Sequence, residues 1–252
     1  GCSDAPVSII RTCGHIRCVN SKALEMAGIT KDTPDPQGGQ IDRDENGEPT
    51  GVLRENARNL VTPLIPETTD EQKVDLVVDL GELLLSQGVT SICDMGNLDP
   101  GDNYDIYTKA VEKGFRQKVG IYYMWDFYAG DDSFRFPEAR KNRDQQIFTA
   151  GLKLIGDGSV SGRTAWMNEP YLGSEDEVGF PVCSDELMES AIQFCKENHC
   201  QLSMHAMGGH AIDRIVDRVY DEEKWTDGDV PHLRIAVSYT HLRAHETRHD
   251  LV

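Results

Sequence analysis

The segment Gly151-Leu152-Lys153-Leu154-Ile155-Gly156-Asp157-Gly158-Ser159 decides the fold, because it joins a short apolar strand to a polar, glycine-rich loop. A second segment of the same kind, Gln201-Leu202-Ser203-Met204-His205, follows about forty residues later and also leads into glycines. Between them, the run from Ser184 to about Asn198 has a capping serine and an apolar face, which predicts a helix. Strand, helix and strand in this order predict parallel strands joined by a right-handed crossover.

The same alternation of helices and strands extends in both directions along the chain. The further elements that it predicts are a helix from a capping box at Thr69 and Gln72 to Gly88, a short buried strand at 89–93, a helix at 104–113, a strand at 118–125, a helix at 211–223 and a strand from about Leu233. The sequence therefore predicts an α/β fold with about five strands of a parallel sheet.

Residues 1–68 do not follow this alternation. A helix is expected from Ser21 to Ala27, ending at Gly28. Beyond it, the stretch 33–50 is rich in Pro, Gly and Asp, and Asn46-Gly47 favours a hairpin turn. We expect residues 1–68 to form an irregular insertion ahead of the sheet.

Composition excludes several classes of protein. The 252 residues include 25 Lys and Arg against 43 Asp and Glu, giving a formal net charge of −18, which would repel nucleic-acid phosphates. No apolar run reaches the roughly 20 residues that cross a bilayer, and no signal peptide is visible at the N-terminus. The seven cysteines include no CxxC pair, which indicates a reducing, cytoplasmic compartment. The composition is compatible with a homo-oligomer as well as with a monomer.

The C-terminal segment contains a misleading pattern. His241, His245 and His249 are spaced to line one face of a helix, as in a metal site. However, the peptide at 237–247, VSYTHLRAHET, matches one reading frame of a transposon-type sequencing adapter, and an eleven-residue match is far more specific than three histidines. We therefore expect residues 237–252 to be a non-native tail.

Three polar residues fall at the carboxyl ends of expected strands, where functional groups of parallel sheets gather: Asp94, Lys153 and His205. A lysine inside an apolar strand needs a partner or a function, because an unpaired buried ammonium is costly. A salt bridge to Asp157 is one alternative for Lys153, and a hydrogen-bonded core histidine is one for His205. The polar loop 159–164 fits either a substrate or anion site or a simple capping loop.

Several ordered blocks of sequence carry a family resemblance. They are RTCGHIRCVNSKAL at 11–24 with AGI at 27–29, GGQI at 38–41, GEPTGVL at 47–53 with Glu55, GVTS at 88–91, Lys153 with DGS at 157–159, RTA at 163–165 with PY at 170–171, and HAMG at 205–208. As a set they resemble amidohydrolase family 3, a group that includes N-substituted formamide deformylase-like enzymes.

The resemblance implies a (β/α)8 TIM-barrel with a small β-sandwich domain and one or two divalent metal ions, usually zinc, at the barrel mouth. By motif it makes Lys153 and His205 metal ligands, and it implies that Lys153 can be carboxylated. It also implies that metal-activated water hydrolyses a C–N bond in an amide, N-formyl or cyclic amide substrate. His15, Glu55 and Arg163 lie in family-like blocks, and we expect them on the substrate side.

The sequence also departs from the family pattern. No HxH pair occurs, the segment 233–236 breaks off where a strand-6 histidine is expected, and Gly209 replaces the usual acidic residue after HAxG. We therefore expect a partial TIM-barrel at 69–236, an internal fragment of a longer enzyme whose catalytic acid or base lies elsewhere. Such a fragment should be inactive and bind zinc weakly.

Two other classes of function remain open at this point. A buried lysine at a strand end also suits a Schiff-base nucleophile in a barrel lyase. Alternatively, the chain is a non-enzymatic binding module, in which Lys153 and His205 have only structural roles.

Overall fold

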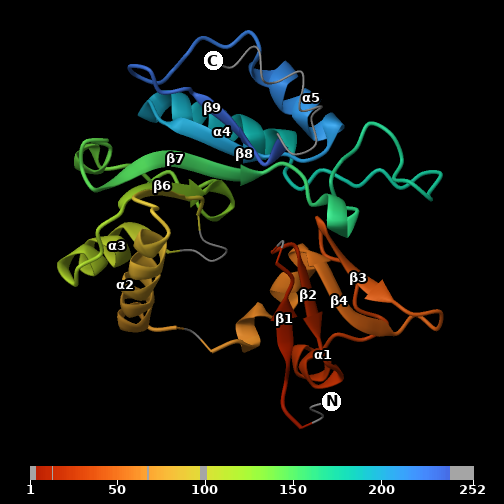
Figure 1. The fold of residues 1–252 in the computed structure, drawn as a ribbon. Helices are drawn as coiled ribbons and strands as arrows, with labels where there is room; N and C mark the ends of the chain where they lie inside the picture. The colour runs from red at the N-terminus through yellow and green to blue at the C-terminus, as the bar shows by residue number, and fades with distance from the viewer. Residues whose placement is uncertain (1–3, 13, 67, 97–100, 239–252) are drawn as a thin grey trace.

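The computed structural model describes residues 4–12, 14–66, 68–96 and 101–238, which form two sheets of different kinds (Figure 1). A small antiparallel sheet comes first and a larger parallel sheet follows, with helices packed on it. The expected non-native tail lies outside the described residues from residue 239 onward. Among the described residues, no helix is long and apolar enough to span a membrane.

The small sheet has four strands in the order β1-β2-β4-β3, all antiparallel. Its elements are β1 (Ser8–Ile10), β2 (Ile16–Val19), α1 (Ser21–Ala27), β3 (Gly39–Arg43) and β4 (Pro49–Glu55). The predicted helix and the hairpin around Asn46-Gly47 are confirmed, and α1 ends at Gly28 with φ 66°. The segment is more regular than expected: β1 and β2 were missed because strands of three and four residues show too little alternation.

The large sheet has five parallel strands in chain order, as the sequence predicted. Its strands are β5 (Ser91–Asp94), β6 (Lys118–Met124), β7 (Ile147–Ile155), β8 (Gln201–His205) and β9 (Leu233–Ala236). The accompanying helices are α2 (Asp70–Ser86), α3 (Asn103–Glu112), α4 (Asp185–Asn198) and α5 (Gly209–Val219). The capping box of Thr69 and Gln72 is present at the start of α2.

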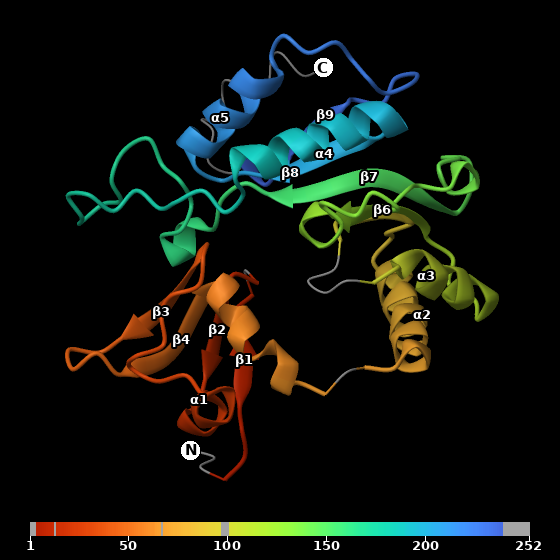
Figure 2. The ribbon, with the colours of Figure 1, turned by 180° about the vertical axis from the view of Figure 1, so that it is seen from behind.

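The helices cover one face of the parallel sheet, and the other face carries polar residues beside a small apolar cluster of Tyr122, Phe148 and Ala150. Leu152, Leu154, Leu202 and Met204 are buried in the core formed with the helices, and Figure 2 shows α4 running along the sheet. The sheet is curled so that its inner face is concave: Arg234 Nη1 on β9 lies 3.7 Å from Cys93 Sγ on β5, although three strands separate them. The parallel sheet is therefore half of a barrel.

One expectation about burial is wrong. The strand at 89–93 was expected to be buried, but β5 begins at Ser91 and exposes alternate residues, because it is an edge strand of the described sheet. On α2, Leu80 and Leu83 are 47% and 55% exposed. They form an apolar stripe with Leu76, which no other described residue buries.

A β-bulge in β7 determines which face carries Lys153. Ile121 pairs with Thr149, whereas the next residue of β6 pairs with Gly151, so Ala150 is an extra residue in β7. Ile147, before the bulge, packs on the helix side. In a regular strand Lys153 would face the same way, since it is six residues further on. The bulge reverses the alternation and turns Lys153 to the concave face.

Replacing Gly151 with alanine should disrupt this region. An added Cβ would lie 1.8 Å from the carbonyl oxygen of Gln201 on β8, so the two strands must separate. We expect Gly151→Ala to lower the free energy of unfolding by about 3 kcal/mol or more, measured by urea unfolding. In the control Gly228→Ala, the new Cβ meets nothing within 4 Å and only φ 57° is strained, which costs about 1 kcal/mol. Equal losses would contradict this account of β7.

Candidate functional site

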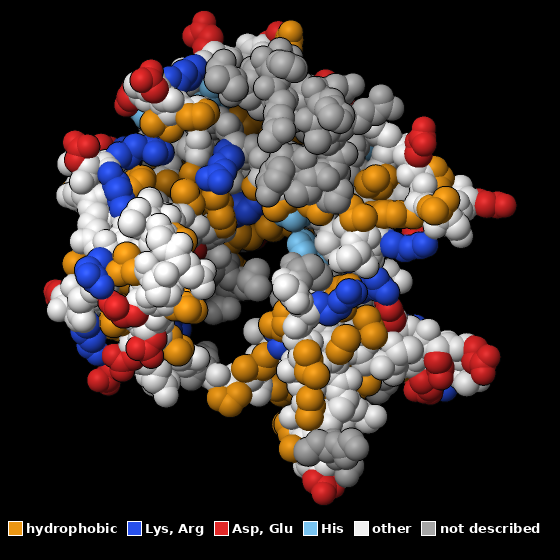
Figure 3. Space-filling view, viewed as in Figure 1, with side chains coloured by type: hydrophobic (Ala, Val, Ile, Leu, Met, Phe, Trp, Pro, Cys, Tyr) orange, Lys and Arg blue, Asp and Glu red, His pale blue; other side chains and the backbone are white. Residues whose placement is uncertain are grey.

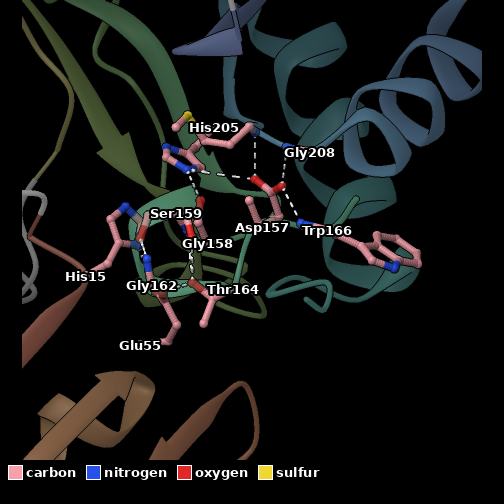
Figure 4. Close-up of polar contacts among 12 residues, drawn as sticks. His15, Glu55, Asp157, Gly158, Ser159, Gly162, Thr164, Trp166, His205 and Gly208 are labelled. Atoms are coloured by element: carbon pink, nitrogen blue, oxygen red, sulfur yellow. Dashed lines mark hydrogen bonds and ion pairs between the residues drawn. The ribbon is translucent and has the colours of Figure 1, made fainter. Parts of the chain in front are cut away.

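The candidate site lies where β7 and β8 end and where the small sheet touches the loop that leaves β7 (Figure 4). The space-filling view shows histidine side chains in the hollow between the small sheet and the half-barrel (Figure 3). Arg54 on β4 helps to join the two parts by donating to the carbonyl of Gly162 at 2.7 Å. The carboxyl ends of parallel strands are where ligands bind in such sheets.

Asp157 organises the loops around the site. Its side chain is fully buried and accepts three backbone N–H groups, from Trp166 at 2.9 Å, Met207 at 2.9 Å and Gly208 at 2.8 Å. Burial raises the pKa of this carboxyl, and the hydrogen bonds from the backbone oppose that shift. Sequence reasoning missed this role, although an aspartate between glycines ahead of a helix start is a signal for it.

Lys153 is 5% exposed and forms no ion pair with Asp157 within 4.0 Å, so the salt-bridge alternative is wrong. Its Nζ donates instead to the carbonyl of Leu154 at 3.2 Å. The pKa of Lys153 is lowered to about 7, mainly by burial and also by the Arg234 guanidinium, while Asp157 opposes the shift. A substantial share of the amine is therefore uncharged near neutral pH and has a free lone pair.

His205 is buried with a defined tautomer. Its Nε2 lies 2.8 Å from the carbonyl oxygen of Gly158. A carbonyl oxygen only accepts, so Nε2 carries the proton and the neutral ring has its lone pair on Nδ1. Burial lowers the pKa of His205 to about 4, which keeps the ring neutral. In the register of β7 and β8, Lys153 pairs with Ser203, so His205 lies two residues further on the same concave face.

His15 and Glu55 reach this site from the small sheet. His15 Nδ1 lies 2.8 Å from Glu55 Oε2, and the His15 ring centroid lies 5.0 Å from that of His205. Glu55 Oε1 accepts from Thr164 Oγ1 at 2.6 Å, and Thr164 Oγ1 accepts from the N–H of Ser159 at 2.9 Å. Thr164 lay in a polar loop whose role the sequence left open.

The side chains of Arg163 and Asp94 bind residues outside this cluster. Arg163 has φ 55°, and its guanidinium binds Glu177 at 2.6 Å and the carbonyl of Leu172 at 3.0 Å. Asp94 accepts from Asn103 Nδ2 at 2.8 Å. The structure therefore brings together Lys153, His205, His15 and Glu55 among the predicted site residues, and directs Arg163 elsewhere.

The donors present fit part of a metal site. Lys153 Nζ and His205 Nδ1 have lone pairs on one face, which suits zinc or a similar divalent ion. Within the described part of the chain, no three His, Cys, Asp or Glu side chains cluster to hold an ion. Gly209 stands where the family pattern has an acidic residue, and a Cβ added there would lie 2.8 Å from Asn168 Nδ2.

Comparison with known proteins identifies the family. The family model described as "Amidohydrolase family" matches residues 1–248. The chain belongs to the amidohydrolase family. This amidohydrolase family chain is 30% identical over 223 residues to YtcJ of Bacillus subtilis (strain 168), covering 86% of this chain and 41% of that protein. It is 26% identical over 224 residues to N-substituted formamide deformylase of Arthrobacter pascens, covering 84% and 40%.

Solved structures agree with the fold. An uncharacterized metal-dependent hydrolase from Pyrococcus horikoshii OT3 superposes with a TM-score of 0.54 at 25% identity, covering 86% of this chain and 42% of that one. A second one, from Pyrococcus furiosus, gives 0.55 at 24% identity, covering 86% and 44%. The family resemblance and the partial TIM-barrel are thus confirmed. This amidohydrolase family chain spans about two fifths of the length of these relatives.

The lowered pKa of Lys153 predicts a pH-dependent stability. The folded pKa is about 7 and the unfolded one about 10.4, so between these pH values the unfolded chain binds more protons and stability rises with pH. From about pH 7 to about pH 9, the unfolding free energy of the wild type should gain about 2 kcal/mol relative to Lys153→Met. Urea unfolding with a chelator present measures it.

Lys109→Met, which removes an exposed lysine from α3, is the matched control. If the difference between wild type and Lys153→Met stays constant over this pH range, the buried amine is charged at neutral pH and cannot act as a ligand in that form.

Proposed function

We propose that the chain is part of a metal-dependent amidohydrolase that hydrolyses a C–N bond in a small amide, N-formyl or cyclic amide molecule. The observation that supports this most is the pair of buried donors Lys153 and His205, on adjacent strands and one face, both with depressed pKa values. Family membership and the metal-dependent hydrolases of similar fold support the same reaction class.

Lys153 and His205 would hold the metal ion, and carboxylated Lys153 would offer oxygen ligands able to bridge two ions. When bound, zinc polarises the scissile carbonyl and lowers the pKa of its water toward neutrality. The remaining residues orient these groups: the Gly158 carbonyl fixes the His205 ring, and Asp157 fixes the loops on both sides. We propose that the catalytic acid or base is a residue that this chain does not supply.

We propose that residues 1–68 are the substrate-side part of the barrel domain and that residues 69–236 are the partial barrel. His15 lies at the edge of this site and is the residue best placed to contact a substrate. Arg163 would contact a substrate only after leaving Glu177. A cytoplasmic location fits the free thiols of Cys18, Cys93, Cys183, Cys195 and Cys200.

Extending the coding sequence to the length of the relatives should yield an enzyme that hydrolyses N-formyl amines or simple amides. A chelator should abolish the activity and zinc should restore it. Lys153→Ala and His205→Ala should each lower kcat/KM by about a hundredfold or more, because removing a ligand costs at least as much as removing its supporting contact. Amine release on a panel of substrates measures this.

Lys109→Ala on α3 is the matched control and should retain full activity. Activity that survives chelation and both site variants would overturn the proposal. A substrate adduct trapped on Lys153 by borohydride would favour the Schiff-base alternative instead.

The 252-residue chain alone should bind zinc weakly, because its described residues offer two donors where a closed zinc site takes four. After dialysis against buffer, plasma emission should find much less than one zinc per chain, and Lys153→Ala should change that value little. One tightly held ion per chain would contradict this expectation.

A further inference from the structure

Glu55 lies at the point where the small sheet meets the loop that leaves β7. Its backbone has φ 46° and ψ −126°, outside the regions that a residue with a side chain normally adopts. Such a conformation costs about 1–3 kcal/mol and persists only where the surroundings enforce it. Here the Glu55 N–H donates to the His15 carbonyl at 2.9 Å, and the Glu55 carbonyl accepts from Arg58 Nε at 2.9 Å.

Protein donors occupy both carboxylate oxygens of Glu55. Oε2 is bound to His15 Nδ1, Oε1 is bound to Thr164 Oγ1, and the residue is 3% exposed. Figure 4 shows the side chain between these two partners. A substrate would have to displace one of them to reach the carboxylate, so the geometry does not suit Glu55 as a substrate ligand.

The contact with His15 has a chemical consequence. A carboxylate oxygen accepts, so the hydrogen bond requires the proton on His15 Nδ1. Nε2 is then the ring atom that His15 presents away from Glu55, and the ring lies 5.0 Å from that of His205. Partners of this kind fix both the tautomer and the orientation of a histidine ring.

We propose that Glu55 is a positioning residue that acts through His15. It holds the Nδ1–H tautomer, so that Nε2 faces the substrate beside His205, and its bond to Thr164 attaches the small sheet to the β7 exit loop. The role of His15 toward a substrate rests on the proposed function, whereas the bonds of Glu55 to His15 and Thr164 do not. No other described contact ties His15 and the 159–164 loop to one side chain.

Nitrogen-15 NMR of the histidine side chains tests the proposal on the 252-residue chain, in chelator and without substrate. His15→Asn assigns the His15 signals. In the wild type at about pH 9, well above the ordinary pKa of a histidine, His15 should show a protonated Nδ1 and an unprotonated Nε2. Glu55→Leu has a side chain of similar size that can accept neither bond. The two His15 nitrogen shifts should then move toward each other, and amide exchange at Ser159 should become about tenfold faster.

Glu45→Leu, at an exposed position in the β3–β4 turn, is the matched control and should leave both signals unchanged. Thr164→Val removes the bond to Glu55 and also the acceptor of the Ser159 N–H, so Ser159 exchange should accelerate while the His15 shifts stay as in the wild type. A neutral wild-type His15 with its only proton on Nε2 would overturn the proposal, even if Glu55→Leu fails to fold. Unchanged His15 shifts in folded Glu55→Leu would overturn it as well. Neither result involves hydrolysis, so failure of the proposed reaction would be recognised separately.

Discussion

The buried carboxylate of Asp157 is the contact on which the rest of the site depends. Its two oxygens accept backbone N–H groups from Trp166, Met207 and Gly208, which lie in two loops far apart in the sequence. Without a compensating set of donors, a fully buried carboxylate would be very costly, so these bonds have to form together. One side chain therefore fixes the exit of β7, the segment after Thr164 and the start of α5.

The position of the metal-ligand candidates follows from this arrangement and from the bulge in β7. The bulge turns Lys153 to the concave face, and the loop fixed by Asp157 places the Gly158 carbonyl against His205 Nε2. The small sheet then closes the site from the other side, where His15 meets His205. Arg234 on the same concave face also lowers the pKa of Lys153, and burial has the larger effect.

The sequence predicted the parallel sheet well, because strands such as Gln201–His205 are short apolar runs between clear helix signals. It placed Lys153 and His205 at strand ends for the same reason. It did not reveal the bulge, since an extra Ala150 leaves no trace in the pattern of apolar residues. Nor did it reveal the bonds of Glu55 to His15 and Thr164, because side chains 40 and 109 residues apart meet only through the tertiary fold. Burial of β5 was overestimated, because a short apolar run does not show whether other residues cover it.

The burial that makes Lys153 and His205 unusual also prepares them for a cation. In water both would carry protons near or below neutral pH, and a protonated nitrogen has no lone pair for a metal ion. Desolvation lowers the pKa of each, to about 7 and about 4, so protons compete less with a metal for these nitrogens. Two positive side chains on one face would also repel each other, and losing their protons removes that repulsion. Desolvation therefore favours the unprotonated forms of Lys153 and His205 that the proposed metal site would need.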